Sequence, residues 1–339
     1  FADRRLRACW PAVGGLGSRV PIVDPSSYQP PRLLQDGHAQ TLFAAVSRRV
    51  RGVEYTRQRI ETDDGDFLDV DWIRQGGRRL VILSHGLEGD SRRPYMRGMA
   101  RAFRRRGWDV AAWNARGSSG EDNRTLRFTH SGATDDLATV VRAALAPGGY
   151  EAWALVGFSL GGNLTLKYLG ERGEDVPPGL VGGVAFSVPC DLDRAARRMA
   201  ERSNRFYMRR FLGDLAERIR RKAVRFPGQV DAAPIAGMRS FHEFDERYTA
   251  PLHGFRDAAD YYARSSSLAY LRGIRVRTLL VNAVDDPFLT PECLPYEVAA
   301  ANGFLHLETP EKGGHVGFVS LGTRGEYWSE RRATAFLQA

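Results

Sequence analysis

The sequence predicts an α/β fold built on a mostly parallel, eight-stranded sheet flanked by helices, with a helical cap inserted late in the chain. Three observations predict it. Short apolar runs of strand length recur along the chain, helical stretches separate most of them, and the alternation lapses between residues 191 and 270. Strands that alternate with helices indicate βαβ units and hence parallel pairing. The 339 residues, 43% hydrophobic and 26% charged, suffice for a sizeable core.

Residues 1–52 are rich in Pro, Gly and Arg, which predicts an irregular arm that wraps the core. Four prolines exclude a long helix there: Pro21, Pro25, Pro30 and Pro31. The residues Arg4-Arg5-Leu6-Arg7 ahead of the run 8–17 faintly resemble a signal sequence, but Pro11 and three glycines inside that run argue against one.

The core is predicted to comprise residues 53–190 and 271–339. Residues 53–61 and 66–73 alternate apolar and polar side chains around an Asp-Asp-Gly turn, as a hairpin does. Residues 80–83 are wholly apolar, which indicates a strand buried on both faces. Further strands are predicted at 110–113, 152–158, 180–186, 276–283 and 304–307, and helices at 95–106, 135–146, 160–172 and 291–301.

Residues 191–270 predict the helical cap, inserted after the sixth of these strands. Arg-rich and aromatic helical segments at 191–222 and 254–264 flank a loop that contains Pro227 and Pro234. Four aromatic residues of this segment are candidates to cover an apolar pocket: Phe206, Tyr207, Phe211 and Phe226. Packing of the cap on the core is the alternative role for them.

The net charge of +9 comes almost wholly from arginine, since the chain has three lysines. The basic clusters are scattered over several predicted helices, at residues 104–106, 197–198, 209–210 and 218–222, so we interpret them as solvated helix faces. Nucleic acid is not an expected partner, because no nucleic-acid module accompanies the clusters. Peripheral contact with an anionic membrane stays open, and composition does not indicate the oligomeric state.

Cysteine usage indicates the compartment. Cys9, Cys190 and Cys293 are few, odd in number and far apart, which favours a reducing compartment over a disulfide framework, and none has metal-ligand spacing. No apolar run approaches the roughly 20 residues of a membrane-spanning helix. We therefore expect a soluble, cytoplasmic protein without a metal.

The pattern Gly157-Phe158-Ser159-Leu160-Gly161 follows an apolar strand and opens a helix. In that context it predicts a nucleophile elbow, the sharp turn that exposes the nucleophilic serine of the α/β-hydrolase fold. Side chains at the two glycine positions would collide with the neighbouring strand or helix.

A serine hydroxyl becomes a good nucleophile only when an adjacent base takes its proton. His315 lies in a Gly-rich loop after the last predicted strand, and Asp285 and Asp286 end the strand before it. The order Ser, Asp, His is that of the α/β-hydrolase triad. Neighbouring residues at a strand end point in opposite directions, so only one aspartate faces the histidine. We choose Asp286, which precedes the turn-forming Pro287, with Asp285 as the alternative.

Acyl transfer also needs hydrogen-bond donors for the oxyanion. Residues 84–89, Ser-His-Gly-Leu-Glu-Gly, directly follow the strand at 80–83. The backbone N–H groups of Leu87 and Leu160 are our candidates for that hole. We interpret His85 as structural.

These motifs together resemble the bacterial YheT-like and plant embryogenesis-associated branch of the α/β-hydrolases, which is related to eukaryotic lipid-ester hydrolases and yeast ethyl-ester-forming acyltransferases. The resemblance rests on residues 28–31, 37–41, 84–89, 114–117, 129–132, 244–245 and 285–288. It implies a lipid or short-to-medium acyl ester as substrate and no cofactor. It also suggests acyltransferase activity through an H-x-x-x-x-D box, which both 85–90 and 130–135 match.

The sequence therefore predicts a serine hydrolase that cleaves carboxylic esters through an acyl-serine intermediate. Two alternatives stay open: an acyltransferase that passes the acyl group to an alcohol, and a non-catalytic binding protein on the same fold. We expect the triad on core loops and the cap outside them, so that the cap sets acyl chain-length preference.

Overall fold

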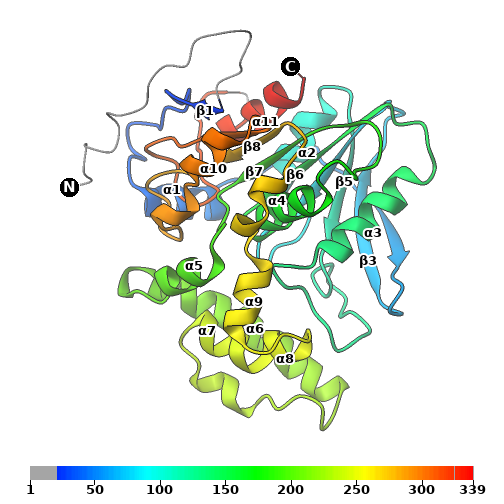
Figure 1. Cartoon of the computed structure of the whole chain (residues 1–339), viewed down its shortest axis with the longest axis vertical. Helices are drawn as coiled ribbons and strands as arrows, with labels where there is room; N and C mark the ends of the chain where they lie inside the picture. The colour runs from blue at the N-terminus through cyan, green and yellow to red at the C-terminus, as the bar shows by residue number, and fades with distance from the viewer. Residues whose placement is uncertain (1–20, 324, 339) are drawn as a thin grey trace.

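The computed structural model describes residues 21–323 and 325–338; Cys9 and the signal-like run 4–17 lie outside the described residues. Its described part contains one sheet in the order β1-β9-β8-β7-β6-β4-β5-β3-β2 (Figure 1). The strands are β1 (Ile22–Val23), β2 (Thr56–Glu61), β3 (Phe67–Ile73), β4 (Arg79–Ser84), β5 (Asp109–Asn114), β6 (Ala152–Phe158), β7 (Leu180–Phe186), β8 (Thr278–Val281) and β9 (Leu305–Glu308).

Strand pairing confirms a mostly parallel sheet. Only the pairs β2 with β3 and β3 with β5 are antiparallel; the other neighbours run parallel. The predicted count of eight strands was wrong for the described residues, because Ile22 and Val23 pair with Leu307 and Glu308 as a ninth.

The arm is also less irregular than predicted. It contains helix α1 (Gly37–Val46), which begins only after the last proline of the arm, Pro31. The Asp36 carboxylate caps this helix by accepting a hydrogen bond of 2.9 Å from the Ala39 N–H group. The Pro-rich composition forbids a helix only up to that point.

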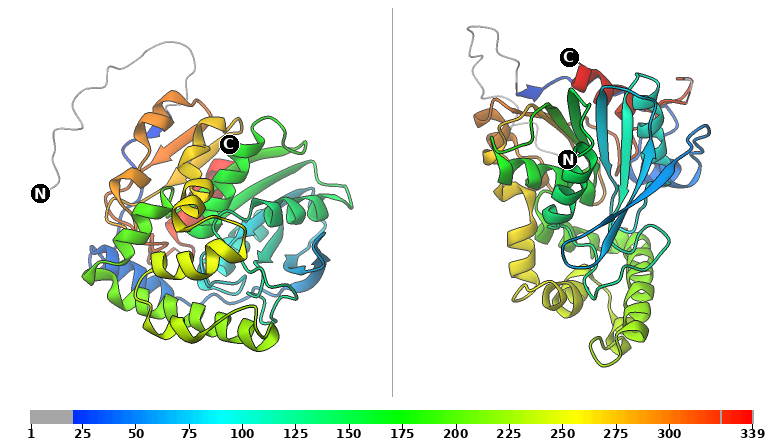
Figure 2. Two further views of the ribbon diagram at one scale, coloured as in Figure 1. Left: turned by 60° about the horizontal axis from the view of Figure 1, so that its bottom comes forward. Right: turned by 90° about the vertical axis from the view of Figure 1, so that its right-hand side faces the viewer.

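Helices cover both faces of the sheet (Figures 1 and 2). Alternate residues of β4 enter two separate cores: Leu80 and Ile82 pack on one face, and Val81 and Leu83 on the other. All four are fully buried, as a wholly apolar strand predicts. The first face carries α3 (Thr134–Leu145), α4 (Leu160–Arg172) and α10 (Tyr296–Ala301), and the second carries α2 (Pro94–Arg104) and α11 (Trp328–Gln338).

The helix predicted at 291–301 is confirmed only in its second part. Residues 291–301 form a short 3-10 turn at Pro291–Cys293 and then α10, which begins at Tyr296. Pro295 stands between them, and proline lacks the N–H group that a continuous helix needs at that point.

Between β7 and β8 the chain leaves the sheet and forms the cap, which gathers at one end of the molecule (Figure 1). Its helices are α5 (Leu192–Met199), α6 (Arg205–Arg225), α7 (Phe241–Phe244), α8 (Ala250–Leu252) and α9 (Ala258–Ser265), with a π-helical turn at Asp245–Thr249. Apolar residues of α6, including Leu212, Leu215 and Ile219, build a separate hydrophobic core with Phe244 and Tyr248.

Candidate active site

Ser159 lies on the turn between β6 and α4, in a conformation that L-residues rarely adopt, with φ 53° and ψ −119°. Its N–H group donates to the Phe186 carbonyl of the neighbouring strand β7, at 2.9 Å. A Cβ atom at Gly157 would lie 2.2 Å from the Gly161 carbonyl oxygen, and one at Gly161 would lie 2.3 Å from the Ser84 oxygen. Only glycine fits at both positions, so the strained turn is built into the sequence.

Three predicted site residues form a chain of hydrogen bonds. The Ser159 Oγ atom lies 2.9 Å from His315 Nε2, and His315 Nδ1 lies 2.9 Å and 3.2 Å from the two carboxylate oxygens of Asp286. Because a carboxylate only accepts, Nδ1 carries the proton and Nε2 is left to accept from the serine hydroxyl. The Phe288 ring packs 4.3 Å from the imidazole. This geometry allows His315 to take the Ser159 proton.

The two adjacent aspartates have different partners. The Asp286 carboxylate is buried, and the N–H group of Phe288, beyond Pro287, donates to it at 2.9 Å. The Asp285 carboxylate points away and accepts the Gly314 N–H group, also at 2.9 Å. Burial raises the pKa of Asp285. The acid that contacts His315 is therefore Asp286, and Asp285 holds the backbone of the histidine loop.

Two residues that the sequence did not predict bind the backbone of the loop that carries His315. The Thr41 hydroxyl of α1 accepts the His315 N–H group at 2.8 Å and donates to the Gly37 carbonyl at 2.7 Å. On the other side, the Ser187 hydroxyl accepts the Val316 N–H group at 2.8 Å. The motif at 37–41 could have indicated a role for Thr41. Its sequence does not show, however, that Thr41 on α1 contacts His315, which lies 274 positions later.

The two predicted oxyanion donors both border Ser159. Leu160 is the first residue of α4, so its N–H group has no partner within the helix. Leu87 follows Gly86, whose own N–H group already donates to the Tyr95 hydroxyl at 3.0 Å. Within residues 21–323 and 325–338, no group accepts a hydrogen bond from the Leu87 N–H. Both amides are therefore available to a ligand at Ser159.

The cap contacts the loop that carries Leu87. Arg218 of α6 donates to both carboxylate oxygens of Glu88, at 3.1 and 3.0 Å, and to the Arg116 carbonyl at 2.9 Å. Glu88 has a positive φ of 50°, and Arg93 donates to its carbonyl at 2.6 Å. Arg218 and Lys222 are buried, so their interpretation as a solvated helix face was wrong; both bind oxygen atoms of the core.

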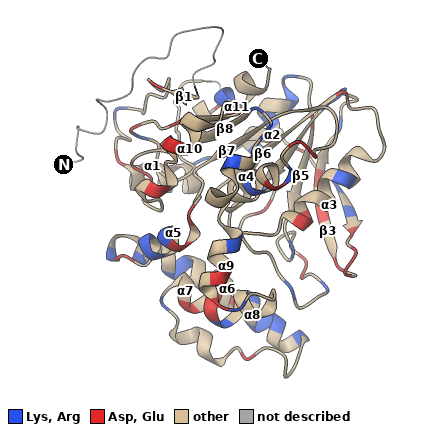
Figure 3. Ribbon diagram, viewed as in Figure 1, with Lys and Arg blue, Asp and Glu red and all other residues tan. Residues whose placement is uncertain are grey.

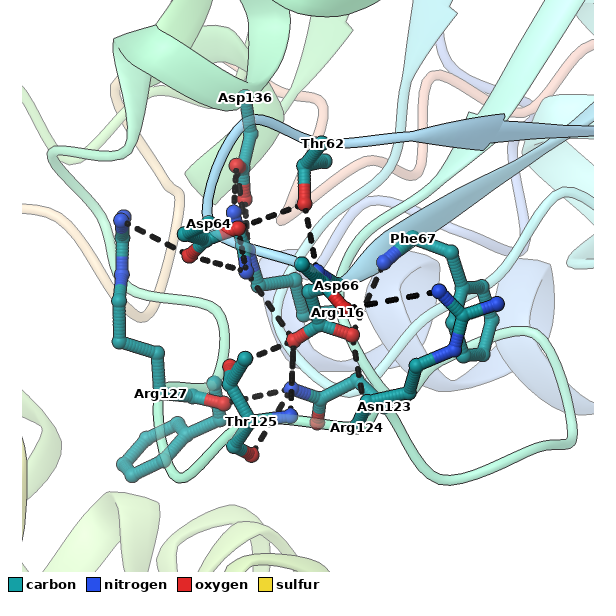
Figure 4. Close-up of polar contacts among 12 residues, drawn as sticks. Thr62, Asp64, Asp66, Phe67, Arg116, Asn123, Arg124, Thr125, Arg127 and Asp136 are labelled. Atoms are coloured by element: carbon teal, nitrogen blue, oxygen red, sulfur yellow. Dashed lines mark hydrogen bonds and ion pairs between the residues drawn. The ribbon is translucent and has the colours of Figure 1, made fainter.

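Lys222 donates hydrogen bonds to the loop that contains Asn123 and Thr125. A buried cluster of ion pairs and hydrogen bonds holds this loop (Figure 4). In this cluster Arg116 contacts Asp64 at 2.8 Å, Asp66 at 3.0 Å and Asp136 at 2.8 Å. Burial alone would raise the pKa of Asp66, but hydrogen bonds, including those from Thr125, Asn123 and two backbone N–H groups, hold it well below its usual value. Lys222 donates to the same loop, at 2.7 Å to Asn123 Oδ1. The carboxyl-terminal half of α6 is thus fixed to the core at two points.

The two H-x-x-x-x-D boxes do not bring their histidine and aspartate together by a hydrogen bond. His85 Nε2 accepts the Ala115 N–H group at 3.0 Å, so its Nδ1 carries the proton and donates to the Gly86 carbonyl. Burial lowers the pKa of His85. In the second box His130 Nδ1 accepts the Gly132 N–H group, and Asp135 pairs with Arg127. Both ring nitrogens of His85 thus bond to backbone groups, which fits the structural role that the sequence analysis assigned to it.

A cavity between the cap and the core ends at Ser159 and His315. Its empty volume, including its opening, is about 840 Å³. Its walls are predominantly apolar, and both Leu87 and Leu160 border it. Of the four cap aromatics named from sequence only Phe211 lines it, together with residues that include Leu215, Phe241, Phe244 and Phe288. A cavity of this size and character suits an acyl chain.

No cluster of three or more His, Cys, Asp or Glu side chains that could hold a metal occurs among the described residues. Cys190 and Cys293 are both buried and free. In the part of the chain that the structure describes, no helix has the length and apolar character to cross a membrane.

The comparison with protein families decides the classification. The family model described as "alpha/beta hydrolase fold" matches residues 79–320, which include Ser159, Asp286 and His315. This chain belongs to the α/β-hydrolase family. The match begins at β4, the strand that precedes the loop of Leu87.

Relatives of this α/β-hydrolase align along nearly its whole length. The YheT protein of Escherichia coli, a candidate esterase by its name, is 35% identical over 93% of this chain and 95% of its own length. The human protein "Phospholipase ABHD3" is 28% identical over 96% of this chain and 81% of its own. Among solved structures, an esterase of Pyrococcus furiosus covers 86% of this chain and 97% of its own, with a TM-score of 0.57 and 19% identity. At that identity the structural likeness shows the shared fold.

Proposed function

We propose that this protein is a serine hydrolase of carboxylic esters, with Ser159 as nucleophile, His315 as general base and Asp286 as the triad acid. The observation that supports it most is the hydrogen-bonded chain of these three side chains at the end of an apolar cavity. The names of the relatives, an esterase and a phospholipase, support ester hydrolysis as the general activity.

In the proposed cycle His315 takes the Ser159 proton while the serine oxygen attacks the ester carbonyl. The Leu87 and Leu160 N–H groups stabilise the oxyanion. The protonated His315 then gives its proton to the departing alcohol, and an acyl-serine remains. Water activated by the same histidine releases the acid. Asp286 keeps the imidazole oriented and stabilises its charged form, and no step requires a cofactor.

The substrate class follows from the cavity. The apolar side chains that line it would bind the acyl part of a lipid or of a short-to-medium acyl ester. A second cavity also reaches Ser159 and leaves room for an alcohol acceptor. Acyl transfer to an alcohol is therefore the alternative activity.

The test uses p-nitrophenyl esters of graded chain length and a fluorophosphonate probe. Ser159→Ala should lower kcat on the order of 10⁶-fold and abolish labelling, because the triad acts as a unit. Ser329→Ala on the remote helix α11 is the matched control and should retain both. Labelling that persists in Ser159→Ala would place the nucleophile elsewhere.

The same assays distinguish the two alternative functions, an acyltransferase and a non-catalytic binding protein. Ester formation that exceeds acid release when an alcohol is added would favour the acyltransferase. A wild-type protein that binds esters without turnover or labelling would favour a non-catalytic binding protein.

A further inference from the structure

Two cavities meet at the nucleophile. Besides the cavity under the cap, a second one, which we call the α1–α6 chamber, is also bordered by Ser159 and His315. Its walls come from α1, from the loop 86–95 and from the first half of α6, and its empty volume, including its opening, is about 1190 Å³. The chamber therefore leads from the surface to the site by a route distinct from the cavity under the cap.

The rim of this chamber carries exposed apolar side chains. Leu42 is 39% exposed, Val46 74% and Phe206 65%. Leu42 and Val46 are four residues apart on α1 and so share one face of the helix. Ten large hydrophobic residues are exposed in the described part of the chain, and three of them lie on this rim. Apolar side chains gathered at one opening mark an interaction surface.

Contacts with the core and with α1 hold α6 at both ends. Arg218 and Lys222 fix the carboxyl-terminal half of α6 to the core. At the other end of α6, the Tyr207 hydroxyl lies 3.2 Å from His38 Nδ1 of α1, and the two rings stack. With α6 held at both ends, its outer residue Phe206 stays in place at the rim.

The surroundings of the rim are basic. Arg210 lies one helical turn after Phe206 and lines the chamber together with Arg93 and the acidic Asp214, while the exposed Arg205 and Arg209 of the same half of α6 border a neighbouring cavity. Arg49 is exposed three residues after Val46. Arg49, Arg205, Arg209 and Arg210 form no ion pair with another described residue. Figure 3 shows basic residues recurring along α5 and α6. Apolar side chains among unpaired arginines match the interior and the phosphate groups of an anionic lipid layer.

We propose that the mouth of the α1–α6 chamber docks on an anionic lipid bilayer. Leu42, Val46 and Phe206 enter the headgroup region, and the surrounding arginines face lipid phosphates. A lipid ester then passes from the bilayer through the chamber to Ser159 without crossing bulk water. The proposal rests on the proposed function, because it supplies the ester to that site.

The test is vesicle flotation with Ser159→Ala protein, so that binding is measured without turnover. Vesicles of phosphatidylcholine with roughly a third phosphatidylglycerol are compared with pure phosphatidylcholine. The protein should bind the anionic vesicles more tightly, and binding should weaken as salt is raised, because salt screens the arginines. Equal binding to both vesicles would overturn the charge part of the proposal.

A rim variant tests the apolar part. Val46→Ser combined with Phe206→Ser should weaken binding to the anionic vesicles at least about fivefold. The matched control is Val224→Ser, which changes an 85% exposed valine on α6 that does not line the chamber and should leave binding unchanged. Equal losses in the rim variant and in this control would refute docking at this mouth.

Failure of the docking proposal is separable from failure of the proposed function. Wild-type protein that hydrolyses a water-soluble ester but does not bind vesicles contradicts only the docking. Protein that binds vesicles through the rim but hydrolyses no ester contradicts the catalytic assignment.

Discussion

The buried Arg218 of the cap and the partly buried Glu88 of the loop that carries Leu87 form an ion pair, with both carboxylate oxygens within 3.1 Å of guanidinium nitrogens. The cap thus contacts the loop of the proposed oxyanion donor directly. The sequence places the triad on core loops and the cap outside them, which predicts that the cap alters chain-length preference more than the reactivity of Ser159 towards a small probe.

Arg218→Met should lower kcat for a small soluble ester about 10- to 100-fold with little change in KM, because in the proposed mechanism Leu87 donates mainly to the oxyanion of the transition state. The affinity for a trifluoromethyl ketone, which binds as a tetrahedral adduct, should fall in parallel. Loss of a buried ion partner also destabilises by about 3–5 kcal/mol, so the measurement is made on protein shown to be folded.

Arg221→Met is the control for Arg218→Met. It removes a half-exposed pair with Asp122 from the same helix and should change stability by less than about 1 kcal/mol, with kcat unaffected. If both variants show the same kcat, the contact with Glu88 has no positioning role.

Asp286→Asn should cost up to about 10⁴-fold in kcat, because the amide favours the wrong tautomer of His315. Asp285→Asn should cost far less, since that carboxylate contacts the Gly314 backbone. Kinetics on a soluble ester compare the two variants. A larger loss from Asp285→Asn would exchange the roles of the two aspartates.

Thr41→Val keeps the shape of the side chain and leaves the His315 N–H group without its acceptor. We expect a stability loss of about 1–3 kcal/mol together with a lower kcat. Thr41→Ser, which retains the hydroxyl, should recover most of the activity. Thr334→Val on α11 also removes a buried hydroxyl that bonds to its own helix, and it should cost stability alone. Full activity in Thr41→Val would mean that α1 does not position the histidine.

Asp245 lines the cavity under the cap. Its raised pKa should make the free energy of unfolding depend on pH. Burial raises its pKa to about 7, whereas in an unfolded chain it is about 4. The folded protein therefore holds a proton that the unfolded chain releases between these values, so the free energy of unfolding falls as pH rises from about 4 to 7. Asp245→Asn should lack this decrease. Urea denaturation at pH 5 and pH 7.5 measures it, and parallel pH profiles of the two proteins would contradict the prediction.

Local chemistry made much of the core predictable. The wholly apolar strand at 80–83, the Gly-x-Ser-x-Gly turn and the order of the three site residues are each contained in a short stretch of sequence. Contacts between distant segments were not predictable in this way. β1 has two residues and depends on pairing with β9, and Thr41 gains a role only where α1 meets the histidine loop. In the sequence Arg218 resembles a surface residue, and only the fold shows that it pairs with Glu88.

Contacts between early and late segments determine when the site can form during synthesis. The Thr41 hydroxyl accepts from the His315 N–H group, Ser26 donates to Glu308, and Arg48 pairs with Glu330, so contacts between residues more than 270 positions apart join early and late segments of the chain. During synthesis Ser159 leaves the ribosome long before His315 exists, and the early segments wait for their partners. Under the proposed mechanism, the nascent chain therefore carries Ser159 without its base, and ester cleavage requires that the early and late segments have come together.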